Sequence, residues 1–170
     1  MKKIKLLFTG LLFSIILVNA QYEIGDKVDD FKLKNIDGKY VSLSDYDEAK
    51  GFILVFTCNT CPFAIKYEDR IIALHEEFAS RGYPVVAINP NSVEKKPGDS
   101  LKEMKERAKK KEYGFVYLRD DDQKVAKRFG AERTPEIFLL QKDGKDVILK
   151  YTGTIDNNVD DASKADKHYV

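Results

Sequence analysis

The chain alternates between continuous apolar runs and segments with an apolar residue every three to four positions. This alternation predicts strands and helices in turn. Residues 51–56 are continuously apolar and residues 84–89 nearly so, which is typical of central strands covered on both faces. Between them, residues 63–80 carry apolar side chains every three to four positions, which predicts an amphipathic helix. Gly82 follows as a stop signal for this helix.

The same alternation continues toward the C-terminus. Ser100 is followed three residues later by Glu103, a pattern that predicts the start of a charged helix. Residues 115–118 predict a short strand, and residues 121–129 predict a short helix with Gly130 after it. Strands and helices in alternation favour a layered α/β domain.

Two β-hairpins are predicted on either side of these elements. Residues 31–34 and 40–43 alternate between apolar and polar positions, and so flank the first turn. Residues 136–140 and 147–151 flank the second, and both turns contain Asp-Gly. We therefore expect a central mixed β-sheet with helices on both faces and an N-terminal β-hairpin extension.

The N-terminal segment differs in composition from the rest. Residues 1–20 begin with lysines, continue with an apolar run and end in Val18-Asn19-Ala20, as secretory signal peptides do. The apolar run is shorter than the about 20 residues that a membrane-spanning helix needs. We expect cleavage after Ala20, one domain over residues 21–170 and no stable membrane insertion afterwards. An uncleaved membrane anchor is the alternative.

The C-terminal stretch, residues 156–170, is polar. A domain of this kind would need a further helix to cover the second hairpin, and residues 167–170 resemble the start of one. We therefore expect a truncated C-terminal helix, in a chain that is a C-terminally shortened version of a longer protein.

The net charge limits the classes of partner. The chain has 29 basic and 28 acidic side chains, and the signal peptide would remove three of the lysines. This balance favours neither nucleic acid nor an anionic membrane surface as a partner. The charged run at residues 102–111 is mixed in sign, which is typical of a solvated helix face.

The two cysteines carry the candidate chemistry. Cys58 and Cys61 are the only cysteines in the chain, and they lie between the strand at 51–56 and the helix at 63–80. The free N–H groups and the dipole of a helix start stabilise a thiolate, so a thiol there has a lowered pKa. Pro62 suits the first helical turn. A Cys-x-x-Cys pair in this position predicts a redox centre.

Four groups of residues extend this interpretation over nearly the whole mature chain. They are Ile24-Gly25-Asp26 with Phe31-Lys32-Leu33 and Asp37-Gly38; Cys58-Asn59-Thr60-Cys61-Pro62; Asp120 through Ala126 to Phe129-Gly130-Ala131; and Thr134-Pro135 before Glu136-Ile137-Phe138-Leu139. Together they resemble the thioredoxin superfamily, and within it the redoxin branch of peroxiredoxins and alkyl hydroperoxide reductases. The resemblance implies a thioredoxin fold. It also implies a cis Thr134–Pro135 peptide that faces the cysteines and helps to align a partner chain.

The chain departs from the family pattern at two places. Thr57 stands where the family usually has Trp, and the strand at 51–56 lacks the buried carboxylate that assists proton transfer in thioredoxins. Glu68, Asp69 and Glu136 are candidates for a replacement base, and the sequence does not choose among them. The reduction potential and the direction of electron flow are left open by these departures.

Several chemistries fit the cysteine pair. In dithiol–disulfide exchange, Cys58 would be the exposed attacker with the lowered pKa, and Cys61 would resolve the mixed disulfide. In a peroxidase, Cys61 beside Pro62 would attack the peroxide, and Cys58 would resolve the sulfenic acid. A structural disulfide on a non-catalytic binding domain is a third possibility. A zinc site would have only His75 and His168 to add, neither at finger spacing.

From these alternatives we predict an exported thiol–disulfide oxidoreductase. It would exchange disulfides with partner proteins through Cys58 and Cys61, with Thr134 and Pro135 forming the substrate-binding turn. We expect no metal or organic cofactor. The expected partners are protein thiols or disulfides and an electron-donor protein, and nucleic acid is not among them. The expected location is the periplasm or another extracytoplasmic space, and the peroxidase is the alternative function.

Overall fold

The continuously apolar run forms a buried central strand, as predicted. The computed structural model describes residues 21–170, so the predicted signal peptide lies outside the described residues. The strands are β1 (Lys32–Asn35), β2 (Tyr40–Ser42), β3 (Gly51–Phe56), β4 (Val85–Asn89), β5 (Val116–Arg119), β6 (Glu136–Asp143) and β7 (Asp146–Gly153). The α-helices are α1 (Pro62–Phe78), α2 (Leu101–Lys110) and α3 (Lys124–Phe129). Short 3₁₀ turns cover residues 43–45, 79–81, 97–99 and 162–164.

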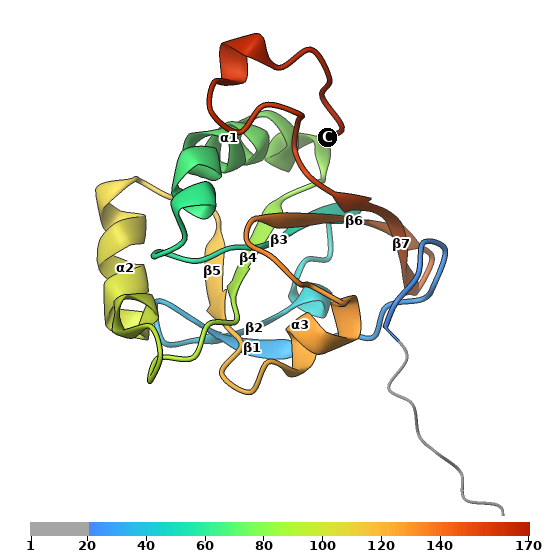
Figure 1. Ribbon diagram of the computed structural model, residues 1–170. Helices are drawn as coiled ribbons and strands as arrows, with labels where there is room; N and C mark the ends of the chain where they lie inside the picture. The colour runs from blue at the N-terminus through green and yellow to red at the C-terminus, as the bar shows by residue number, and fades with distance from the viewer. Residues whose placement is uncertain (1–20) are drawn as a thin grey trace, which may run out of the picture.

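All seven strands form one mixed sheet (Figure 1). Their order is β2-β1-β5-β4-β3-β6-β7. The β3, β4 and β5 strands are parallel to one another, whereas β6 runs antiparallel to β3. The two predicted hairpins are the antiparallel pairs β1–β2 and β6–β7. The sheet topology therefore confirms the mixed sheet and the N-terminal hairpin.

Both faces of the sheet are covered by helices. Successive side chains of a strand point to opposite faces, so alternate residues of β3 pack in two different clusters. Phe52, Leu54 and Phe56 of β3 pack in one apolar cluster together with residues of α3. Ile53 and Val55 pack in a second cluster with residues of α1 and α2. Figure 1 shows α3 on one side of the sheet and α1 and α2 on the other. A strand buried on both faces needs an apolar residue at every position, which explains the continuous run.

Gly51, at the start of β3, occupies a position with no room for a side chain. A Cβ there would lie 2.1 Å from the carbonyl oxygen of Leu140 and 2.6 Å from the ring of Tyr83. We expect Gly51→Ala to lower the free energy of unfolding by about 3 kcal/mol, because a packed sheet must shift to admit the methyl group. Chemical denaturation measures this loss.

Gly38 provides the matched control for this prediction. It lies in the β1–β2 turn at φ +89°, and a Cβ there would meet nothing within 4 Å. Gly38→Ala should therefore lower the free energy of unfolding by only about 1 kcal/mol, the usual penalty for placing a residue with a Cβ at positive φ. Equal losses in the two variants would show that β3 and β6 move apart freely at Gly51, contrary to the prediction.

Helix boundaries differ from the sequence prediction at two ends. The α1 helix ends at Phe78 and continues as a 3₁₀ turn, with the expected stop at Gly82 in the left-handed region at φ 94°. The α3 helix begins at Lys124, three residues later than predicted. The reason is Asp120, whose buried carboxylate accepts the backbone N–H of Ala126 at 2.8 Å. This carboxylate accepts a free N–H group of the first helical turn, and the residues between Asp120 and Lys124 form a turn before the helix.

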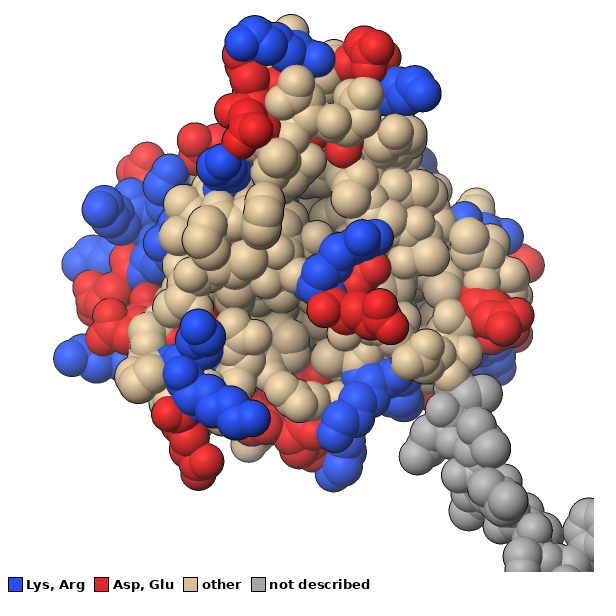
Figure 2. All heavy atoms as spheres, viewed as in Figure 1, with Lys and Arg blue, Asp and Glu red and all other residues tan. Residues whose placement is uncertain are grey.

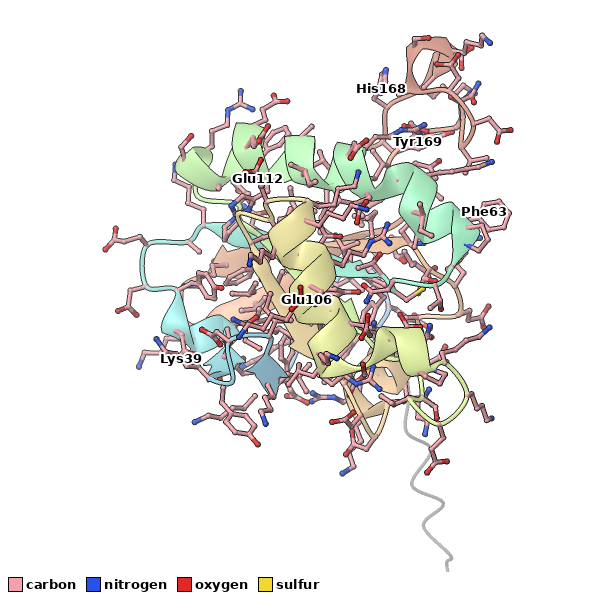
Figure 3. All side chains as sticks on the ribbon, turned by 90° about the vertical axis from the view of Figure 1, so that its left-hand side faces the viewer. Lys39, Phe63, Glu106, Glu112, His168 and Tyr169 are labelled. Carbon is pink, nitrogen blue, oxygen red and sulfur yellow. The ribbon has the colours of Figure 1, made fainter. Side chains whose placement is uncertain are left out.

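The predicted start of a helix at residues 167–170 is wrong. This segment is extended, and the backbone N–H of Tyr169 donates to the carbonyl of Ile155 at 2.8 Å. Asp156 pairs with His168 in an isolated β-bridge, and the buried Asp156 carboxylate bonds to Arg70 of α1 at 2.7 Å. Figure 3 places His168 and Tyr169 on the α1 side of the molecule. The C-terminal segment thus folds back on itself and is held by an ion pair to α1.

Candidate active site

Both cysteines lie in the turn between β3 and α1, as predicted. The backbone N–H of Thr57 still donates to the carbonyl of Ile88 at 2.9 Å, so pairing with β4 continues just past the end of β3. Cys61 is the N-cap residue of α1, and Pro62 is the first residue of the helix. The free N–H groups of the first helical turn therefore lie next to Cys61.

A second loop, just before β6, meets the cysteine turn. The Thr134–Pro135 peptide is cis, as the resemblance implied. The Thr134 hydroxyl lies 3.2 Å from Cys58 Sγ, across a separation of 76 positions in the sequence. The Cys61 thiol donates to the Thr134 carbonyl at 3.3 Å. One residue therefore contacts both sulfur atoms.

The two sulfur atoms differ in exposure, in the opposite sense to the prediction. Cys58 is buried, with only 4% of its surface exposed, whereas Cys61 is partly exposed. Burial raises the pKa of the Cys58 thiol, and the hydrogen bond from the Thr134 hydroxyl offsets this only in part. The prediction that Cys58 is the exposed thiol with the lowered pKa is therefore wrong. The helix begins where it was predicted, but Cys58 is buried and Cys61 is the residue that caps the helix.

Cys61 has the properties of the nucleophile. Burial by itself would raise its pKa, but hydrogen bonds to the sulfur from the backbone N–H groups of Ala64 and Phe63 oppose this. The Thr134 hydroxyl and the Cys58 thiol add to them, and together they lower the pKa of Cys61 below its ordinary value. More Cys61 than Cys58 is therefore thiolate at neutral pH.

The Thr134 hydroxyl provides a direct test of this arrangement. We expect Thr134→Val to raise the pKa of Cys61, because the variant keeps the side-chain shape but loses a donor to the thiolate. The rise should be about one unit, since a hydrogen bond to a charged group contributes about 1.5–3 kcal/mol and one unit corresponds to about 1.4 kcal/mol. The pH dependence of Cys61 alkylation measures it. An unchanged pKa would show that the helix start acts alone.

In residues 21–170, none of the three candidate bases forms a hydrogen bond with a cysteine. Glu68 is buried in an ion cluster with Arg107 at 2.6 Å, and Asp69 pairs with Lys111 at 2.9 Å on the surface. Glu136 accepts the backbone N–H of Glu132 at 2.9 Å.

The carboxylate that does reach the cysteine turn is Asp99, which the sequence analysis missed. It ends the 3₁₀ turn before α2 and is 0% exposed. Its carboxylate accepts the backbone N–H of Asn59 at 2.6 Å and the hydroxyl of Thr60 at 2.7 Å. In the sequence it is one acid within a polar loop, with no local signal of burial.

Two large apolar side chains are exposed close to Cys61 in the sequence. Phe63 and Ile65, in the first turns of α1, are 56% and 44% exposed, and Figure 3 shows Phe63 at the end of that helix. On the face drawn in Figure 2, many charged side chains lie toward the edge, and one group of basic and acidic side chains lies near the centre. Such a surface can pack against an apolar segment of a partner.

Neither histidine is placed as a zinc ligand. His75 Nδ1 accepts the backbone N–H of Val85 at 3.2 Å, and His168 lies in the C-terminal segment. Within the described part of the chain, no three His, Cys, Asp or Glu side chains form a group that could hold a metal ion. That the chemistry needs no cofactor stays a prediction.

Comparison with known proteins identifies a family and several relatives. The model of the AhpC/TSA family matches residues 24–148. A peroxiredoxin of Bacillus subtilis, Bcp, is 31% identical over 142 residues, which cover 72% of this chain and 81% of that protein. The thiol-disulfide oxidoreductase ResA of Bacillus thuringiensis is 24% identical, over 77% of this chain and 70% of that protein.

Solved structures confirm the thioredoxin fold. An uncharacterized conserved protein from Geobacillus kaustophilus is similar with a TM-score of 0.75 and 32% identity, over 81% of this chain and 72% of that one. The exposed lipoprotein thioredoxin of Streptococcus pneumoniae is similar with a TM-score of 0.60 and 26% identity, over 78% of this chain and 93% of that one. The thioredoxin fold predicted from the sequence is therefore correct.

Proposed function

The chain belongs to the AhpC/TSA family, and from this premise we propose that it is a thiol–disulfide oxidoreductase in which Cys61 attacks and Cys58 resolves. The relatives include both a thiol-disulfide oxidoreductase and a peroxiredoxin, so they support a redox function in general. The observation that carries the finer proposal is the contact of Thr134 with both sulfur atoms, with Cys61 partly exposed at the start of α1.

The proposed reaction proceeds in two steps. The Cys61 thiolate attacks a disulfide of the partner, forms a mixed disulfide and releases one partner sulfur as a thiolate. Cys58 then loses its proton and attacks Cys61 Sγ. The Cys58–Cys61 disulfide forms, and the second partner sulfur leaves as a thiolate. The partner gains two electrons, and an electron-donor protein with two thiols restores the reduced pair.

The contacts around the pair suit this sequence of events. Cys58 Sγ and Cys61 Sγ both contact Thr134, at 3.2 and 3.3 Å, so the resolving sulfur lies on the same residue as the sulfur it would attack. The exposed Phe63 and Ile65 side chains offer an apolar surface to a protein partner. Thr134 and Pro135 would contact the partner segment that carries the disulfide.

Hydroperoxide reduction is the second candidate, and the state of Cys61 favours it. A partly exposed thiolate beside Pro62 can attack a hydroperoxide, breaking the O–O bond to give a sulfenic acid and an alkoxide or hydroxide. Cys58 would then attack the sulfenic sulfur, form the disulfide and release water. The similarity to the peroxiredoxin Bcp supports this class of chemistry in general.

Export belongs to the same proposal. It is supported by the signal-peptide pattern of residues 1–20. Among residues 21–170, no helix is long and apolar enough to cross a membrane. We therefore propose a periplasmic or other extracytoplasmic protein that meets thiol and disulfide proteins transiently.

A comparison of two substrates tests the function. The purified chain is given the same dithiol donor with either a disulfide-bonded protein or a hydroperoxide, and kcat/KM is measured for each. The proposal expects faster reduction of the protein disulfide. A higher value for the hydroperoxide would establish the second candidate instead. Inactivity in both assays, together with an unshifted Cys61 pKa near about 8.5, would indicate a non-catalytic binding domain.

A further inference from the structure

Asp99 is a buried carboxylate whose hydrogen-bond partners are all neutral. It is 0% exposed. Besides Asn59 and Thr60, it accepts the side-chain amides of Asn91 at 2.9 Å and Asn89 at 3.1 Å. No Lys, Arg or His within residues 21–170 forms an ion pair with it. A buried charge is costly unless donors surround it, so four neutral donors are what allow a carboxylate here.

Two of these donors are the residues between the cysteines. Asn59 is held further, because its amide donates to the Gly98 carbonyl at 2.9 Å and its oxygen accepts the Tyr117 hydroxyl at 3.2 Å. The backbone also approaches closely, since a Cβ on Gly98 would lie 2.9 Å from Thr60 Cγ2. The turn that ends at Asp99 and the cysteine turn are therefore locked together.

We propose that Asp99 is a positioning residue: a buried carboxylate that fixes the Cys58–Cys61 turn and whose negative charge, held at the residue that follows Cys58, disfavours the Cys58 thiolate. This inference rests on the proposed function, because the order of ionisation matters only if the two thiols react. In this view, both the charge of Asp99 and burial disfavour the Cys58 thiolate, which leaves Cys58 as the resolving cysteine.

The surroundings of Asp99 indicate a fixed anion instead of a proton acceptor. Burial by itself would raise the pKa of Asp99, but the hydrogen bonds from Asn91, Thr60, Asn59 and Asn89 outweigh it and lower the pKa. Four donors also occupy the lone pairs that a proton would need. Asp99 therefore stays charged over the range in which thiols titrate.

The other titratable groups near Cys58 do not cancel this charge. Arg133, next to Thr134, is exposed and pairs with Glu136 at 3.6 Å. Burial raises the pKa of Tyr117, on β5, well above its ordinary value, so its hydroxyl stays neutral. The guanidinium of Arg107, on α2, reaches the Asn59 carbonyl at 3.5 Å but is paired with Glu68. Cys61 becomes negative when it ionises, and its charge raises the pKa of Cys58 in the same direction as Asp99.

A titration of Cys58 alone tests the charge effect. In a Cys61→Ser background, the ultraviolet absorbance of the Cys58 thiolate is followed against pH, with and without Asp99→Asn. The proposal expects the pKa of Cys58 to fall by about one unit in Asp99→Asn, a tenfold gain of thiolate at a pH below the pKa. Thermal melting checks that each variant is folded.

Thr60→Val is the matched control in the same background. It removes one donor to Asp99 and loosens the turn, but it keeps the negative charge. We expect the pKa of Cys58 not to fall in this variant. No fall in Asp99→Asn, or an equal fall in both variants, would overturn the proposal, since the effect would then be absent or merely structural.

A measurement on the unmodified protein serves if Asp99→Asn does not fold. Carbon-13 NMR of the Asp99 carboxyl group should show the ionised form throughout, from about pH 5 to about pH 10, the range that spans thiol titration. Uptake of a proton by Asp99 within this range would overturn the fixed-anion role. Both readouts are independent of turnover, so failure of the substrate assays would remove the proposed function without affecting them.

Discussion

Cys61→Ser abolishes turnover, whereas Cys58→Ser keeps the first step and accumulates a mixed disulfide with the partner. This is the expected result because Cys61 caps α1 and is partly exposed, while Cys58 is buried. Loss of the attacking sulfur should lower the rate by about a thousandfold or more, since it removes the covalent step itself. Non-reducing electrophoresis of each variant with an oxidised partner shows which one forms the adduct.

The opposite result has a clear meaning. If Cys61→Ser forms the trapped adduct and Cys58→Ser does not, then Cys58 attacks first, as the sequence alone suggested. The position of α1 would then not decide the chemistry. A double variant with both substitutions is the control, because it should form no adduct under either assignment.

Arg107→Met should lower the free energy of unfolding by about 3 kcal/mol, because the buried Glu68 carboxylate then keeps only the partly exposed Lys111 ammonium as its counter-charge. Glu68 of α1 is 4% exposed, and Arg107 of α2 holds both of its carboxylate oxygens, at 2.6 and 3.0 Å. Tyr113 donates to the same carboxylate at 2.5 Å. Chemical denaturation at neutral pH measures the loss.

Lys111→Met is the matched control on the same helix end. The Lys111 ammonium also lies near Glu68, at 3.2 Å, but its side chain is 36% exposed. Its loss should cost no more than about 1 kcal/mol, the usual value for an exposed pair. Similar small losses in both variants would show that Glu68 is solvated, which contradicts its burial in the structure.

The pH dependence of this cluster has a definite sign. Burial would raise the pKa of Glu68, but the hydrogen bonds from Arg107 and Tyr113 and the charge of Arg107 lower it below its unfolded value. The ionised Glu68 carboxylate therefore stabilises the folded state above its unfolded pKa of about 4.3. This stabilisation is lost as the pH falls through the pKa of Glu68 in the folded state. The stability gap between the wild type and Arg107→Met should narrow in acid.

Local sequence patterns determined most of the fold. The run at Gly51–Phe56 was identifiable as a central strand because both of its faces need apolar residues. Details that depend on individual side-chain or backbone contacts were not identifiable in this way. The start of α3 depends on the Asp120 carboxylate, and the extended end of the chain depends on the pairing of Asp156 with His168.

The residues of the candidate site were predictable, but the roles of the two cysteines were not. The cysteine pair and the Thr134–Pro135 turn carry sequence motifs, and the structure brings them together. The start of the helix was predicted to within one residue. Which thiol ionises also depends on how deeply each sulfur is buried, and this burial exists only in the folded chain. Asp99 carries no motif, because its role arises from four contacts that exist only in the folded chain.

The most direct test of the reversed cysteine roles is site-resolved alkylation of the reduced wild-type protein. A substoichiometric amount of iodoacetamide is added at neutral pH, and mass spectrometry locates the label. The structure predicts that nearly all of the label lies on Cys61, with Cys58 following only at more alkaline pH. Label on Cys58 at an equal or greater rate would contradict the account.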